Sequence, residues 1–205
     1  MKRYLYITII SLLFVIKVDA QVWELKKNND GIKVYTKKNK QSPFDLLKAE
    51  CEISVSVDQM LNLIFNVSRH TEWVYNAVQS VLIKSNETYD IIYYGETYAP
   101  WPVSNRDLVI HITALTDSLT GICTIKATSE PNLRPKVAGK IRVPRSISIW
   151  KLTPINSKNT HVTYTLDIDP GGSLPAWLVN YASVEGPYLS FLKMREILLK
   201  QQKMF

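Results

Sequence analysis

The sequence is poor in the residues that build metal, redox and nucleophilic sites. Its 205 residues include two cysteines and three histidines, which form no CxxC pair, no Cys/His zinc set and no HExxH motif. A G-x-S-x-G nucleophile elbow and a phosphate-binding loop are also absent. The sequence therefore lacks the motifs by which zinc enzymes, serine hydrolases and nucleotide-binding proteins are usually recognised, and it gives no reason to place the protein in those classes. We therefore expect no metal, no cofactor and no catalytic residue.

The N-terminal segment has the pattern of a secretory signal peptide. Two basic residues precede an apolar run over 4–16. Val18 and Ala20 then provide the small or medium-sized side chains that a cleavage site after Ala20 needs at its −3 and −1 positions. The run is shorter than the roughly 20 apolar residues that span a bilayer. We expect residues 1–20 to be removed and residues 21–205 to be exported, either to a periplasm or out of the cell. Lys17 is unusual near a cleavage site, so an uncleaved anchor is the alternative.

Residues 21–205 suit one domain, because they can bury a sizeable core and contain no internal repeat or linker-like stretch. The whole chain carries a net charge of +7, and residues 1–20 hold three basic and one acidic side chain, which leaves +5. This excess fits transient contact with an anionic membrane surface. An exported protein is not expected to bind nucleic acid. An ordinary solvated basic surface is the alternative, and we expect a monomer.

The two cysteines lie on the apolar faces of alternating segments. Cys51 alternates with Glu50 and Glu52, and Cys123 falls in a similar pattern. Both positions predict small buried hydrophobic side chains. Export would also permit a disulfide between them, and spacing alone does not decide between the two possibilities.

Hydrophobic periodicity predicts many strands and two helices. Ser56 and Gln59 can form a capping box before a helical stripe over 57–65, which should end before Trp73. A long amphipathic helix is expected over 174–200, bent at Gly186–Pro187. Period-two alternation predicts strands at 22–27, 32–37, 44–55, 80–85, 89–98, 107–116, 121–129, 140–153 and 160–169.

This order of elements predicts an α+β fold in which a curved antiparallel β-sheet wraps around the long C-terminal helix. A twisted sheet of this size curls, and one helix does not fill its concave side. The remaining space would form an internal apolar cavity suited to a hydrophobic ligand.

Three segments of the chain resemble the START (StAR-related lipid-transfer) domain family. They are 23–35, with the Asp30–Gly31 turn, then 100–107 and 169–180; a weaker match at 69–73 resembles the end of the first major helix. The resemblance spans nearly all of residues 23–200. It implies the helix-grip fold and non-covalent binding of one lipid-like molecule in the cavity. It also implies that the C-terminal helix and a neighbouring loop, for which 130–139 is the candidate, gate entry.

The sequence departs from the phosphatidylcholine-binding members of that family. Those members carry an arginine and an acid around the helix-end tryptophan, where this chain has His70 and Val74. They also hold choline in an aromatic cage. None of the corresponding positions is aromatic here, so we predict that phosphatidylcholine is not the preferred ligand; these positions are Gly95, Leu108, Ser146 and Leu166.

The candidate residues of the cavity or its gate combine bulky apolar and cationic side chains. Arg106 and Asp107 could instead form a local ion pair at a structural corner, and Trp177 and Tyr181 could simply pack against the sheet. His111 and Arg145 orient a ligand only if their strand faces point inward. The full set is Trp73, Arg106, His111, Arg145, Trp177, Leu178 and Tyr181.

The expected function is non-catalytic binding, and possibly transfer, of a single hydrophobic lipid-like ligand. The first alternative is an enzyme, similar to the helix-grip cyclases and hydrolases, that acts on a small hydrophobic molecule in the same cavity. A histidine such as His111 bound to a buried carboxylate would favour it. The second alternative is an interaction or envelope module that keeps the fold and has lost its cavity.

Overall fold

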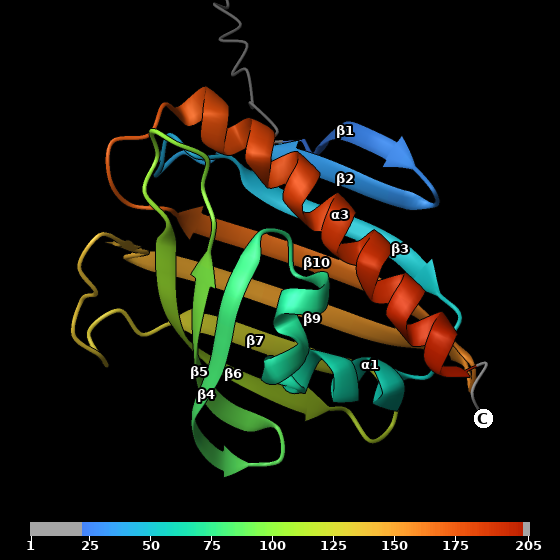
Figure 1. The fold of residues 1–205 in the computed structure, drawn as a ribbon. Coiled ribbons are helices and arrows are strands. Elements are labelled where there is room, and N and C mark those ends of the chain that lie inside the picture. Colours follow the sequence, from blue (N-terminus) through green and yellow to red (C-terminus); the bar gives the residue numbers. More distant parts are fainter. Residues whose placement is uncertain (1–21, 203–205) are drawn as a thin grey trace, which may run out of the picture.

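The computed structural model describes residues 22–202, which form one large sheet covered on one face by helices (Figure 1). The predicted signal peptide at residues 1–20 lies outside the described residues. No helix within residues 22–202 has the length and apolar character needed to cross a membrane.

The main path of the sheet runs in the order β1-β2-β3-β10-β9-β7-β6-β5-β4, and each neighbouring pair on it is antiparallel. The short strand β8 pairs with β6 in parallel. The strands are β1 Glu24–Asn29, β2 Ile32–Lys37, β3 Leu46–Ile53, β4 Ala77–Glu87, β5 Asp90–Thr97, β6 Arg106–Thr116, β7 Cys123–Ser129, β8 Ile141–Arg142, β9 Arg145–Asn156 and β10 Asn159–Asp169.

The helices lie on one face of this curved sheet. The long helix α3 (Ala176–Gln202) crosses it diagonally, and α1 (Val57–Phe65), η1 (Val67–Arg69) and α2 (His70–Trp73) lie beside it (Figure 1). This arrangement is the helix-grip architecture, and it confirms the predicted α+β fold.

Local sequence explains where the elements begin and turn. The predicted capping box is present: Ser56 Oγ accepts a hydrogen bond from Gln59 N, and Gln59 Oε1 accepts one from Ser56 N. Asp30 and Gly31 adopt positive φ in the turn between β1 and β2. At Gly171, also with positive φ, a Cβ atom would lie 3.0 Å from Pro144 Cδ, so glycine permits the redirection into α3.

Several element boundaries differ by a few residues from the sequence-based expectations, and the clearest difference is at Pro144. The predicted strand 140–153 is divided into β8 and β9, because Pro144 cannot donate a ladder hydrogen bond. The helix α3 is continuous through Gly186–Pro187, where a bend is expected, and Pro187 lies inside it. There, Gly186 packs closely against the Tyr75 ring.

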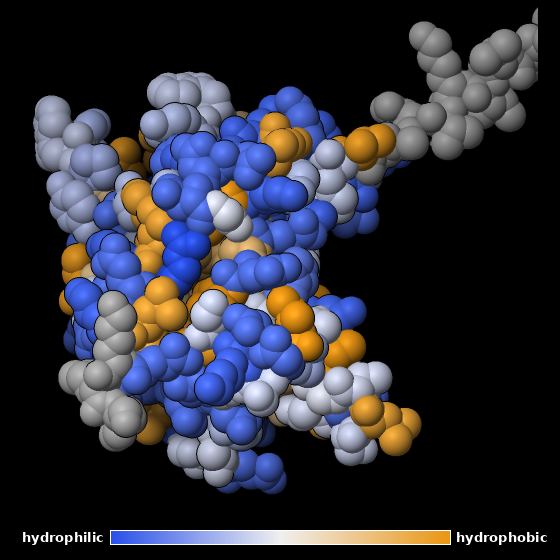
Figure 2. All heavy atoms as spheres, turned by 90° about the vertical axis from the view of Figure 1, so that its right-hand side faces the viewer, coloured by the Kyte–Doolittle hydropathy of each residue, from blue (hydrophilic) through white to orange (hydrophobic). Residues whose placement is uncertain are grey.

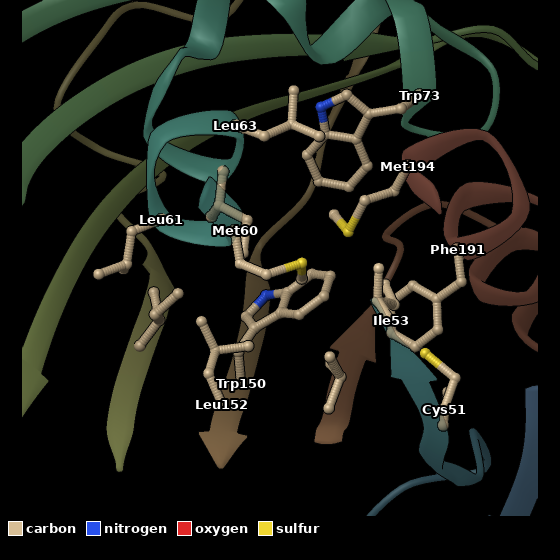
Figure 3. Packing of buried hydrophobic residues seen from close by; sticks show 14 of the residues in the cluster. Cys51, Ile53, Met60, Leu61, Leu63, Trp73, Trp150, Leu152, Phe191 and Met194 are labelled. Carbon is tan, nitrogen blue, oxygen red and sulfur yellow. The ribbon is translucent and has the colours of Figure 1, made fainter. Parts of the chain in front are cut away.

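The core lies between α3, α1 and the central strands. Phe191 and Met194 of α3 point toward Trp150 of β9, Met60 of α1 and Ile53 of β3 (Figure 3). All five are buried. Burial of a side chain of this size contributes about 1.5–3 kcal/mol, so this cluster fixes the C-terminal half of α3 to the sheet.

Candidate ligand-binding site

A cavity of about 770 Å³ lies between the inner face of the sheet and the N-terminal half of α3. Its walls follow the alternation of the strands. Leu108, Ile110 and Ile112 line it from β6, and Tyr164 and Leu166 line it from β10. Because alternate residues of a strand point to opposite faces, one apolar stripe from each strand builds the cavity wall.

One end of the cavity is aromatic. The ring centroid of Trp150 lies 4.5 Å from that of Tyr164, 5.3 Å from that of Phe191 and 6.3 Å from that of Trp73. Burial raises the pKa of Tyr164 to about 12, so its phenol stays neutral. This end offers an uncharged surface to hydrocarbon or to a ring system.

The cavity reaches solvent near the start of α3. Apart from Gln79 of β4, the exposed residues of its lining belong to segment 98–103 and to the first turns of α3; Tyr98 is 51% exposed and Tyr181 is 65% exposed. The surface of the molecule at the opposite, C-terminal end of α3 is more hydrophilic. Figure 2 shows that hydrophilic residues predominate there and hydrophobic residues lie in small groups.

Arg106 is the buried cation of the cavity wall. It is 8% exposed, and its Nη1 donates to Ser104 O at 2.5 Å, while its Nη2 lies 3.5 Å from Gly171 O. No carboxylate of residues 22–202 forms an ion pair with it, and burial lowers the pKa of its guanidinium. The Arg106 Nε atom is buried without a hydrogen-bond partner.

Two further buried polar atoms without a partner line the same cavity. They are Trp73 Nε1 and Ser80 Oγ. A buried donor that lacks an acceptor costs about 1–3 kcal/mol. Donors gathered around one cavity therefore favour a ligand that carries acceptor oxygens.

Glu96 is a carboxylate of the lining, and it is neutralised within the protein. It accepts hydrogen bonds from Lys140 Nζ and, at 2.7 Å, from Asn105 Nδ2. Burial acts to raise the pKa of Glu96, but the hydrogen bonds from Lys140 and Asn105 outweigh it, so the pKa is lowered. Glu96 therefore stays ionised and paired.

Comparison with known proteins identifies the family. Residues 12–203 match the sequence model of the START domain. The chain belongs to the START domain family. Its relatives include lipid-transfer proteins.

Individual START relatives cover most of the chain. An uncharacterized protein of Pseudomonas aeruginosa is 36% identical over 169 residues, which are 82% of each chain. A crystal structure of a STAR-related lipid transfer protein from Xanthomonas axonopodis superposes with a TM-score of 0.80 at 32% identity, covering 86% of this chain and 98% of that one. The phosphatidylcholine transfer protein of Bos taurus is 24% identical and covers 82% and 80% of the two chains.

Four of the seven predicted site residues line the START cavity. Trp73 lies at its aromatic end, Arg106 in the wall, and Leu178 and Tyr181 on α3. Tyr181 nevertheless remains largely exposed, because it lies where the cavity opens.

The other three predicted residues lie away from the cavity. His111 Nε2 donates to Asp90 Oδ1 at 2.7 Å on a partly exposed part of the sheet, and this bond lowers the pKa of Asp90. Arg145 pairs with Asp167 at 2.5 and 2.8 Å, and its side chain is 41% exposed. Trp177, expected to face the sheet, is 71% exposed.

Arg106 and Asp107 do not form the local ion pair that the sequence offers as an alternative. Adjacent residues on a strand point to opposite faces, so Asp107 turns away from Arg106. It binds Arg142, which donates from Nε at 3.1 Å and from Nη2 at 2.8 Å.

The loop at the mouth of the cavity also differs from the expected one. Residues 130–139 do not line the cavity; three of their carbonyls, on Pro131, Arg134 and Pro135, accept hydrogen bonds from Arg142. Residues of segment 98–103 line the opening instead. Its Pro100 and Pro102 mark a rigid turn in the sequence, which was the available signal.

All four positions that the resemblance assigned to the choline cage line the cavity. They are Gly95, Leu108, Ser146 and Leu166. None of these four side chains is aromatic, so this part of the wall offers no ring face to a ligand.

Proposed function

We propose that this START domain binds one lipid-like molecule non-covalently in the cavity beneath α3. The cavity itself carries the proposal: its volume of about 770 Å³ falls within the roughly 300–1,000 Å³ of small-molecule sites, and its lining is mostly apolar. Each methylene moved from water into such a space contributes about 0.8 kcal/mol. The presence of this hollow argues against a module that has lost its cavity.

The proposal assigns binding and no chemistry to the cavity. Its two lining carboxylates are already paired, Glu96 with Lys140 and Glu185 with Lys27. The lining histidine, His70, donates from Nε2 to Ile64 O at 2.8 Å, and burial lowers its pKa. The arrangement that would favour an enzyme, a cavity histidine on a buried carboxylate, is not supported, because the His111–Asp90 pair lies elsewhere.

The ligand that we propose is not phosphatidylcholine. Quaternary ammonium groups are usually held by aromatic rings. The wall at Gly95, Leu108, Ser146 and Leu166 offers none. The relative from Bos taurus named for phosphatidylcholine transfer is only 24% identical, which leaves room for a different head-group specificity.

We further propose that α3 and segment 98–103 open at a membrane surface to exchange the ligand. Four exposed aromatic residues, Tyr98, Trp101, Trp177 and Tyr181, belong to this part of the molecule. Tryptophan and tyrosine favour the membrane interface, and the net positive charge favours anionic lipid. Export as a monomer after cleavage near Ala20 belongs to the same proposal, and mass spectrometry of a secreted form beginning at Gln21 would test the cleavage.

A cavity-filling variant tests the binding site. A Cβ atom at Gly95 would make only ordinary contacts, 3.6 Å to Tyr93 and 3.9 Å to a Gln79 carbonyl, so Gly95→Leu fills space without backbone strain. After incubation with mixed-lipid vesicles, the wild type should be recovered with one lipid per chain and Gly95→Leu with much less. Thr124→Leu, on an exposed strand position, is the matched control. Equal recovery of lipid by Gly95→Leu and Thr124→Leu would contradict the assignment.

A further inference from the structure

Two buried arginines near the start of β6 have opposite surroundings. Arg142 holds the carboxylate of Asp107 with its Nε and Nη2 atoms and gives its remaining donors to loop carbonyls. Arg106 lines the cavity, and its Nε atom has no partner. The same chain therefore shows one guanidinium with a bound carboxylate and one without.

Several carboxylates of the described residues are engaged by other partners. Asp107 binds Arg142, Glu96 binds Lys140, and Asp167 binds Arg145. Asp169 Oδ1 accepts from the backbone N–H of Gly171 at 2.9 Å. Within residues 22–202, Arg106 has no counter-ion, and a buried charge without one is costly.

The free edge of Arg106 has the right shape for an oxyanion. The parallel N–H groups of Nε and Nη2 form the fork that binds a carboxylate or phosphate with two hydrogen bonds. Arg142 uses this edge for Asp107. In Arg106, Nε is unpaired and Nη2 has only a 3.5 Å contact with Gly171 O.

We propose that Arg106 binds the carboxylate or phosphate oxygens of an anionic lipid whose hydrocarbon part occupies the cavity. This inference rests on the proposed lipid-binding function and names the head-group class.

The position of Arg106 suits a head group. It begins β6, opposite Thr97, and its Nη2 lies 3.8 Å from the point where a Cβ atom of Gly172 would be. Thr97 lines the cavity next to segment 98–103, and Gly172 belongs to the turn that leads into α3, so Arg106 lies near the exposed part of the lining. The aromatic end around Trp150 and Phe191 is left for the tail.

A matched pair of ligands separates the contribution of the head-group charge to affinity from that of the hydrocarbon chain. Oleate and oleyl alcohol share one chain and differ in the head group, so the ratio of their dissociation constants isolates the anion. Hydrogen bonds to a charged group predict a roughly ten- to hundredfold preference for oleate in the wild type. Arg106→Gln should bring the ratio close to one, and Arg106→Lys should keep part of the preference. Arg145→Gln removes the same charge away from the cavity and should keep all of it.

A second pair identifies the kind of oxyanion. Vesicles containing dioleoyl phosphatidate or dioleoylglycerol are offered to the protein, and the lipid it extracts is measured. A preference for phosphatidate that exceeds the preference for oleate assigns phosphate; the reverse order assigns carboxylate. Inorganic phosphate alone should bind weakly, because it lacks the hydrocarbon. If it binds as tightly as phosphatidate, the lipid part of the inference is overturned.

The outcomes distinguish the two proposals. If no probe binds, the proposed lipid-binding function fails. If the wild type binds the charged and neutral members of both pairs equally, or if Arg106→Gln keeps the preference, only the anionic head group fails. Should Arg106→Gln not fold, the wild-type ratios and Arg106→Lys still decide between these results.

Discussion

Lys27 of β1 and Glu185 of α3 form an ion pair across 158 positions of the sequence: Lys27 Nζ donates to Oε1 at 2.8 Å and to Oε2 at 2.7 Å. The ammonium also lies 3.9 Å from the centroid of the Tyr188 ring. The two side chains are partly buried, 19% and 28% exposed. These contacts hold the middle of α3, the helix that covers the cavity, against the edge of the sheet.

Removing this contact should speed lipid exchange. Lys27→Met takes away an ion pair and a cation–π contact, together about 1 kcal/mol, which corresponds to about a fivefold faster release if opening of α3 limits the rate. Release of a fluorescent fatty acid to acceptor vesicles measures it. Lys26→Met is the control, because Lys26 pairs with Glu24 and not with α3. An unchanged rate in Lys27→Met would show that the exchange step does not break this contact.

Tethering α3 should have the opposite effect. Asn180 Oδ1 accepts a hydrogen bond from the Asp45 backbone N–H at 3.0 Å, so the two residues are direct neighbours and are the pair that we select for cysteine substitution. The oxidised Asp45→Cys/Asn180→Cys protein should retain preloaded lipid and stop exchanging it, and reductant should restore exchange. Normal exchange in the oxidised protein would count against gating by this half of α3.

The Arg142–Asp107 pair should dominate the stability of this end of the sheet. The two side chains are 2% and 0% exposed, so Asp107→Asn leaves a buried cation without its counter-ion. We expect the free energy of unfolding in urea to fall by about 3–5 kcal/mol. The double variant Asp107→Leu/Arg142→Met should recover part of this loss, because no buried charge remains. An unchanged free energy in Asp107→Asn would mean that the pair does not contribute.

The two native cysteines should be inert in the folded protein. Cys51 and Cys123 are free and buried, and burial raises the pKa of the Cys51 thiol to about 12, so little thiolate is present at pH 8. A thiol reagent added without reductant should label neither residue in the native state and both in urea. No labelling in urea would reveal a disulfide and contradict the free thiols.

Periodicity predicted the fold because each element carries its own signal. The capping box at Ser56 and the alternation around Cys51 both depend on neighbours in the sequence, and both are present in the structure. At Pro144 the alternation continues through the proline, and only the structure shows that the strand divides there. Local sequence patterns thus predicted the presence and type of each element more accurately than the residues at which it begins and ends.

The site was only partly predictable, because period-two alternation does not say which face of a strand points inward. The alternation made His111 and Arg145 cavity candidates only if their strand faces point inward, and both residues lie outside the cavity. The unpaired state of Arg106 depends on Asp107 turning toward Arg142, 35 residues away in sequence. Contacts of this kind are set by strand register, which the sequence pattern alone does not specify.

Native mass spectrometry of the full chain, purified gently from its source, tests the central claim most directly. We predict a population with one lipid-sized mass bound per chain, released as a single class of molecule on organic extraction. A protein that is recovered without bound lipid, and that takes none from vesicles made from its own membranes, would contradict the assignment of a lipid carrier.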